Sequence, residues 1–103
     1  MGIGFNPTDR PFDWTHVVAT AQVKSGHGML HSITINRGDP AAGRVLTVYD
    51  GIGVTADIIS IISLDTAVFV IPQTLIYDCG FLTGLYVAFD GAVTLADLTI
   101  SYK

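Results

Sequence analysis

The sequence predicts an all-β fold, and three of its features lead to this prediction. Aspartate supplies all nine acidic side chains, whereas glutamate, which is a good helix former, is absent. Short runs of β-branched and aromatic residues alternate with Gly, Pro and Asp, which favour turns. No window of useful length has apolar residues at the i, i+3, i+4 spacing of an amphipathic helix.

Turn residues divide the chain into short runs that are expected to form strands. In 29–36, Met29, His31, Ile33 and Ile35 share one side, and the residues between them, Leu30, Ser32, Thr34 and Asn36, share the other. This period of two is typical of a strand with one buried side. The run 56–64 is apolar on both sides, as expected of a covered strand. Eight such runs predict an antiparallel β-sandwich that is jelly-roll-like, with about eight strands. The expected strands are 16–24, 29–36, 44–50, 56–64, 67–71, 74–79, 84–90 and 93–102.

Residues 1–15 differ from the remainder, so we expect an extended N-terminal arm, followed by a single β-sandwich domain over 16–103. The arm contains two prolines, which disfavour helix and sheet interiors. It also carries three large aromatic residues, Phe5, Phe12 and Trp14, which need cover. Either the arm folds back on its own domain, or it lies across a neighbouring subunit, where aromatic anchors contribute most to binding.

The composition predicts contact with partner proteins. Half of the 103 residues are hydrophobic and only 14% are charged, against about 25% in an ordinary soluble domain. The mean hydropathy is +0.52. A small domain has much surface for its volume, so some of this apolar material is expected to meet other subunits. Ile59 and Ile61, on the two-sided strand, are candidates for such an interface, with burial inside the sandwich as the alternative.

Several other kinds of site have little support. The tripeptide Arg37-Gly38-Asp39 matches an integrin ligand, but it lies between two expected strands among turn residues, so we interpret it as a turn. The spacing of the three histidines does not indicate a metal site, and no motif for a catalytic centre or a cofactor is present. With a net charge of −4 and scattered basic residues, nucleic-acid binding is not expected. No apolar stretch predicts a membrane span, and the lone Cys79 allows no internal disulfide.

Over residues 28–102 the chain resembles a class of small bacteriophage virion structural proteins. The resemblance rests on short motifs that are structural rather than chemical. They are Gly28, Leu30, Ile33 and Ile35, then Val48-Tyr49-Asp50-Gly51, then Phe81 with Gly84-Leu85, and finally Asp97-Leu98-Thr99-Ile100 with Tyr102. The resemblance implies capsid decoration or another accessory position in the virion.

We therefore expect a non-enzymatic capsid decoration or cement protein, made in the host cytoplasm and located on the capsid surface. Its partner would be the major capsid protein, bound across neighbouring subunits, and the protein itself would be a homo-oligomer, a trimer or dimer. One alternative is a receptor- or glycan-binding module of a head or tail fibre, with Tyr49, Tyr77 and Tyr86 as the aromatic surface. Another is a structural protein of the tail or connector.

Overall fold

The computed structural model describes residues 12–39, 44–64, 73–90 and 96–103, and every regular element in these ranges is a β-strand. The fold class predicted from the sequence, an all-β antiparallel sandwich, is therefore confirmed. The eight strands are β1 (Asp13–Val17), β2 (Ala21–Ser25), β3 (Gly28–Arg37), β4 (Val45–Asp50), β5 (Asp57–Ser63), β6 (Gln73–Phe81), β7 (Gly84–Phe89) and β8 (Asp97–Tyr102).

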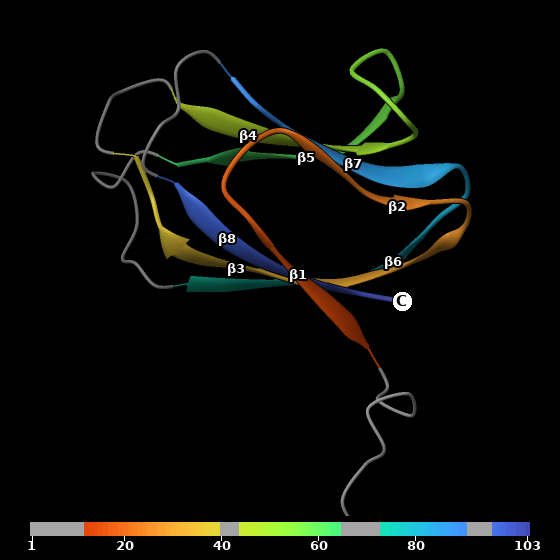
Figure 1. Cartoon of the computed structure of the whole chain (residues 1–103), viewed down its shortest axis with the longest axis horizontal. Coiled ribbons are helices and arrows are strands. Elements are labelled where there is room, and N and C mark those ends of the chain that lie inside the picture. Colours follow the sequence, from red (N-terminus) through yellow and green to blue (C-terminus); the bar gives the residue numbers. More distant parts are fainter. Residues whose placement is uncertain (1–11, 40–43, 65–72, 91–95) are drawn as a thin grey trace, which may run out of the picture.

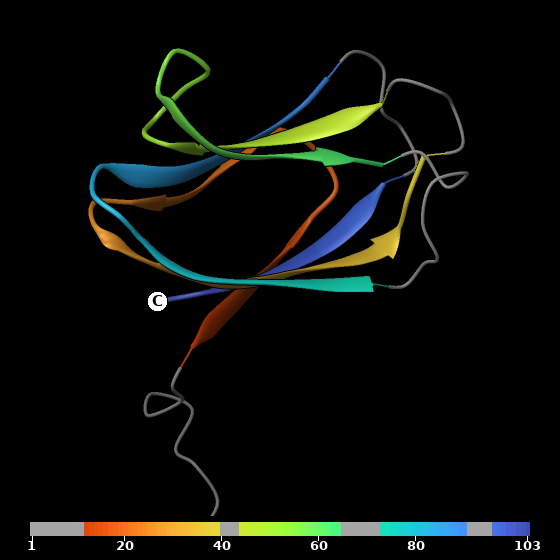
Figure 2. The ribbon, with the colours of Figure 1, turned by 180° about the vertical axis from the view of Figure 1, so that it is seen from behind.

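The strands form two four-stranded antiparallel sheets that face each other (Figure 1). Sheet A has the order β1-β8-β3-β6, and sheet B has the order β2-β7-β4-β5. Of the successive strand pairs, β4 and β5 alone are hydrogen-bonded neighbours, so every other connection passes from one sheet to the other. Figure 2 shows the same two layers from behind.

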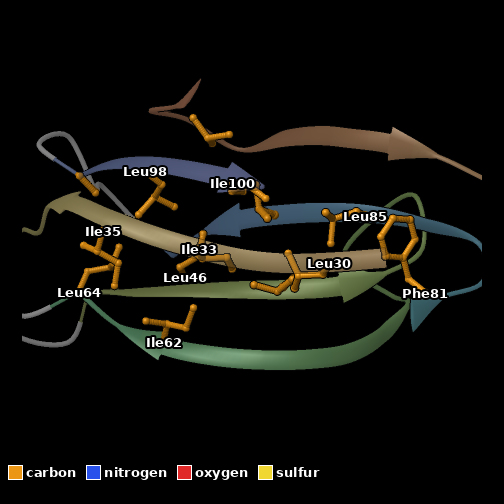
Figure 3. Close-up of a cluster of buried hydrophobic side chains, with 14 residues drawn as sticks. Leu30, Ile33, Ile35, Leu46, Ile62, Leu64, Phe81, Leu85, Leu98 and Ile100 are labelled. Carbon is orange, nitrogen blue, oxygen red and sulfur yellow. The ribbon is translucent and has the colours of Figure 1, made fainter. Parts of the chain in front are cut away.

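The core lies between the sheets and is made almost entirely of aliphatic side chains. Leu30, Ile33 and Ile35 of β3 point toward Leu46 of β4 and Leu85 of β7 (Figure 3). All five are fully buried. Burial of one such side chain contributes about 1.5–3 kcal/mol, so the alternating apolar positions of the central strands are the main source of stability.

One of the predicted strands is divided in two, and most of the others differ from their predicted bounds by one or two residues. The predicted strand 16–24 is two strands, β1 and β2, because the chain crosses from sheet A to sheet B at residues 18–20. No Gly or Pro marks this crossing, so the sequence pattern does not reveal it. The sandwich also begins at Asp13, before the predicted arm boundary at residue 15, because β1 pairs with β8. The predicted strand 67–71 lies outside the described residues.

The alternation predicted for β3 holds over only part of the strand. Ile33 and Ile35 are buried as expected, but Leu30, rather than Met29 or His31, fills the next core position. The register of β3 against both neighbours shifts between Leu30 and Ser32, which is a β-bulge. One extra residue reverses the side on which the following side chains lie, so His31 leaves the core side.

Candidate partner-binding surfaces

The outer face of sheet A carries polar side chains that hydrogen-bond across the strands, although Trp14 and Ile76 are also exposed there. The hydroxyls of Thr34 on β3 and Thr74 on β6 lie 2.9 Å apart. The side-chain amide of Asn36 donates to Asp97 (3.1 Å) and to Thr99 (3.0 Å), both on β8. A surface whose polar groups already bind one another and water has little to gain by entering an apolar interface.

Asp97 links three strands of this outer face. His16 Nε2 on β1 lies 2.5 Å from Asp97 Oδ1, and Asn36 reaches the same oxygen from β3. The Asn36 amide, followed by the His16 hydrogen bond, lowers the pKa of the Asp97 carboxyl below its ordinary value. In its carboxylate form, Asp97 on β8 therefore binds side chains of both neighbouring strands, β1 and β3.

A second histidine–aspartate pair joins β3 to β6. His31 Nδ1 is hydrogen-bonded to Asp78, which has the left-handed backbone angle φ of 48°. The Phe12 ring stacks on the imidazole of His31 with ring centroids 4.3 Å apart. The alternation in the sequence placed His31 on the same side as Ile33, and the bulge in β3 accounts for the difference.

The outer face of sheet B, by contrast, is mostly apolar, and we call this set of residues the apolar face. The cross-strand pairs Tyr49–Tyr86 and Thr47–Ala88 lie on the central strands β4 and β7. On the edge strand β5, Ile58 and Ile61 pair with Tyr49 and Thr47 and are 56% and 61% exposed. Val54, from the β4–β5 loop, completes the apolar face.

The apolar face contains a hollow of about 330 Å³. It is lined by Thr47, Tyr49, Val54, Ile61 and Ala88, with Asp90 among its polar residues. Because Thr47 and Ala88 are small and adjacent, they leave space that larger residues on the central strands would fill. Tyr49 and Tyr86 form a tilted aromatic pair with ring centroids 6.2 Å apart.

A second apolar surface, the loop end, consists of the β4–β5 loop (51–56) and the β6–β7 turn (82–83). These segments lie together at one end of the sandwich (Figure 1). Ile52 is 71% exposed and Leu82 is 82% exposed. Large apolar side chains in a solvated turn contribute nothing to the core, so they are available to a partner.

The loop end is held by the carboxylate of Asp50. Its oxygens accept hydrogen bonds from the backbone amides of Leu82 (2.9 Å) and Thr83 (2.8 Å). The Thr83 amide, followed by that of Leu82, lowers the pKa of Asp50 below its ordinary value. Gly51 N also donates to Gly84 O at 2.9 Å. The turn is therefore ordered before any partner arrives, which lowers the entropic cost of binding.

The five residues proposed for the partner interface occupy different places. Ile61 lies on the apolar face, whereas Ile59 is half-buried and packs against the core, as in the alternative that placed it inside the sandwich. Trp14 is 61% exposed on the edge strand β1. Phe12 stacks on His31, and Phe5 lies outside the described residues. The sequence analysis did not single out Ile52, Val54 and Leu82 as interface residues. The signal that could have found them is that all three are aliphatic residues in turns.

Of the three tyrosines suggested as a glycan-binding surface, two lie together. Tyr49 and Tyr86 are neighbours on the apolar face. Tyr77 is instead half-buried, and its hydroxyl lies 2.8 Å from Ser60 Oγ, joining β6 of sheet A to β5 of sheet B. Tyr77 therefore closes the side of the sandwich.

The Arg-Gly-Asp tripeptide is not displayed as a receptor ligand would be. Asp39 is only 4% exposed and its backbone amide donates to Leu64 O at 2.9 Å. Its carboxylate is therefore withheld from any large partner. The turn interpretation is not what the structure shows, because Arg37 is the last residue of β3 and Asp39 forms an isolated β-bridge.

The described ranges contain no group of three or more His, Cys, Asp or Glu side chains placed to hold a metal ion. No helix in these ranges has the length and apolar character that a membrane span requires. Comparison with protein-family models, with curated proteins and with solved structures finds no match in any of the three.

Proposed function

We propose that the protein is a non-enzymatic capsid decoration protein that binds across neighbouring major capsid protein subunits and stabilises the shell. The observation that carries this proposal is the loop end, where Asp50 holds the turn that carries the exposed Leu82, and where Ile52 is exposed in the adjoining loop. An ordered, exposed apolar loop end suits a protein that acts by binding a partner rather than by catalysing a reaction. The protein would then reside on the virion surface.

The strand order supports the same proposal. Two sheets with the orders β1-β8-β3-β6 and β2-β7-β4-β5, joined by connections that cross between them, are consistent with a jelly roll, an arrangement used by viral capsid domains and by lectins. A fold alone does not define a function. The argument therefore depends on the exposed apolar side chains, and the jelly-roll topology is a supporting point.

Co-sedimentation with undecorated capsid shells tests the proposal. Leu82→Asp places a charge at the most exposed apolar position of the loop end, and we expect it to abolish co-sedimentation. The matched control is Ile76→Asp, on the outer face of sheet A, where the isoleucine is 63% exposed. Shell binding that is unchanged in Leu82→Asp, or that is absent in the natural protein, would rule out this contact.

The hollow on the apolar face favours a second candidate function, a glycan-binding module of a fibre or spike. Tyr49 and Tyr86 provide aromatic rings beside the hollow, and Thr47 and Asp90 provide polar groups. A glycan array measured with the natural protein and with Tyr49→Ala distinguishes the two candidates. A glycan that binds the natural protein but not the variant would favour the second.

A further inference from the structure

The apolar face presents a hollow that no described residue fills. Its lining is mainly aliphatic and aromatic, and Ile58 and Ile61 extend the apolar surface along β5. An apolar side chain that enters the hollow gains about 25 cal/mol for each Å² of apolar surface removed from water. The hollow therefore suits an apolar, aromatic-bearing segment of protein.

The chain itself contains such a segment. Residues 1–11 lie outside the described structure, and their sequence, MGIGFNPTDRP, includes Ile3 and Phe5. Eleven residues can span at most about 40 Å when fully extended. Arg10, at the end of this segment, is opposite in charge to Asp90, which lines the hollow.

The place where this segment joins the sandwich makes the hollow of its own molecule a poor target. Phe12 stacks on His31 at the outer face of sheet A. Figures 1 and 2 both show that β1 begins on the side of sheet A that faces away from sheet B. To reach its own apolar face, the segment would have to reverse direction and pass around both sheets. A second molecule beside sheet A imposes no such reversal.

We propose that the N-terminal segment 1–11 of one copy binds the apolar face of a second copy, with Phe5 in the hollow. The donor segment and the acceptor face are different surfaces, so the contact is heterologous and repeats from copy to copy. Such contacts close into a ring or continue as a chain. This assembly goes beyond shell binding and does not depend on it, because Ile52 and Leu82, the loop-end residues proposed to meet the shell, do not line the hollow. Val54 is the one residue that the loop end shares with the apolar face.

Two full-length variants separate the donor from the acceptor. Phe5→Asp disables the segment and leaves the apolar face intact. Ala88→Arg fills the hollow and leaves the segment intact. We expect the natural protein to be oligomeric by light scattering coupled to size exclusion, and each variant alone to have the mass of a single chain. Circular dichroism and thermal unfolding verify that both variants fold.

Mixing the two variants gives the decisive result. The intact segment of Ala88→Arg can bind the intact face of Phe5→Asp, so we expect a 1:1 complex with twice the mass of one chain. The double variant Phe5→Asp/Ala88→Arg should remain at the mass of one chain, and Ile76→Arg, on the opposite sheet, should assemble like the natural protein.

A monomeric natural protein, variants that still assemble, or a mixture that fails to pair would each overturn the proposal. Loss of shell binding in Leu82→Asp with assembly retained would show that the two contacts are separate.

Discussion

At the scale of single residues, Asp50 and the glycines beside it shape the loop end. A Cβ added at Gly84 would lie 2.7 Å from Gly51 O and 2.9 Å from Lys24 O, both of them backbone atoms. A Cβ added at Gly53, in the same loop, would meet nothing within 4 Å. Glycine is therefore required at position 84 by close packing of the backbone, and it is not required for this reason at position 53.

Replacement of these two glycines gives a matched comparison. We expect Gly84→Ala to lower the free energy of unfolding by about 1–3 kcal/mol, because the backbone must shift to relieve the overlap. Gly53→Ala should change it by less than about 1 kcal/mol. Urea denaturation measures both values. Equal effects of the two substitutions would contradict the packing argument.

The lowered pKa values of Asp50 and Asp97 predict how stability depends on pH. Each carboxyl is more acidic in the folded state than its ordinary value of 3.8, so each contributes stability that is fully present above that value. The contribution is lost as the pH falls through the folded pKa. We expect the urea midpoint to fall as the pH is lowered below 3.8. Asp50→Asn should give a lower midpoint at pH 7 and a smaller loss on acidification.

The control for Asp50→Asn is Asp57→Asn. Asp57 is exposed and pairs with Asp50 across the base of the hairpin, so its replacement removes a similar charge without removing the acceptor for the turn amides. An acid dependence as strong in Asp50→Asn as in the natural protein would mean that Asp50 does not contribute to it.

At the scale of elements, β5 shows how one strand serves both the core and the surface. Ile62 is 7% exposed and belongs to the core, whereas Ile61 points out from the apolar face. The register against β4 shifts between Val48 and Tyr49, so Ile59 has no counterpart on β4. A regular strand alternates between the inside and the outside, and the bulge at Ile59 interrupts this alternation, so that Ile58 and Ile61, three positions apart, are both exposed.

The two neighbouring isoleucines should therefore differ sharply in their effect on stability. We expect Ile62→Ala to lower the free energy of unfolding by about 2–5 kcal/mol, because it leaves a cavity in the core. Ile61→Ala should stay within about 0.5 kcal/mol, as is usual for surface substitutions. Thermal or urea unfolding of the two variants checks this. A large loss in Ile61→Ala measured at low protein concentration would contradict its exposed placement.

The elements also show what the sequence was able to predict. The alternation of Ile33 and Ile35 with their neighbours correctly predicted their burial, because a regular strand has a period of two. The alternation failed to predict the position of His31, because a β-bulge depends on how two strands pair and the sequence of one strand does not reveal it. Tyr49 and Tyr86 lie on one surface, as suggested, whereas Tyr77 does not. The sequence could not separate the three, because strand order within a sheet is set by packing between distant segments and has no local signal.

At the scale of the whole molecule, the two outer faces differ in character. Sheet A exposes hydrogen-bonded polar side chains together with Trp14 and Ile76, whereas sheet B and the loop end expose Val54, Ile58, Ile61 and Leu82. This distribution predicts that sheet B and the loop end make most of the apolar contact with partner proteins.

Shell binding should carry the thermodynamic signature of an apolar contact. We expect a negative heat-capacity change on binding, because apolar surface is removed from water. We also expect little dependence on salt, because the loop end offers Ile52 and Leu82 rather than charged side chains. Calorimetry at three temperatures and two salt concentrations measures both. An affinity that fell steeply with added salt would indicate an electrostatic contact instead.

The position of β8 has a consequence for the order of events during biosynthesis. β8 lies between β1 and β3 in sheet A, yet residues that it joins to β1, such as His16 and Asp97, are 81 positions apart in the chain. When β1 leaves the ribosome it has no strand to pair with, and it must wait until nearly all of the remaining domain has been made. Its apolar and aromatic residues are exposed during that interval, so a nascent chain halted before β8 would be a substrate for chaperones and proteases.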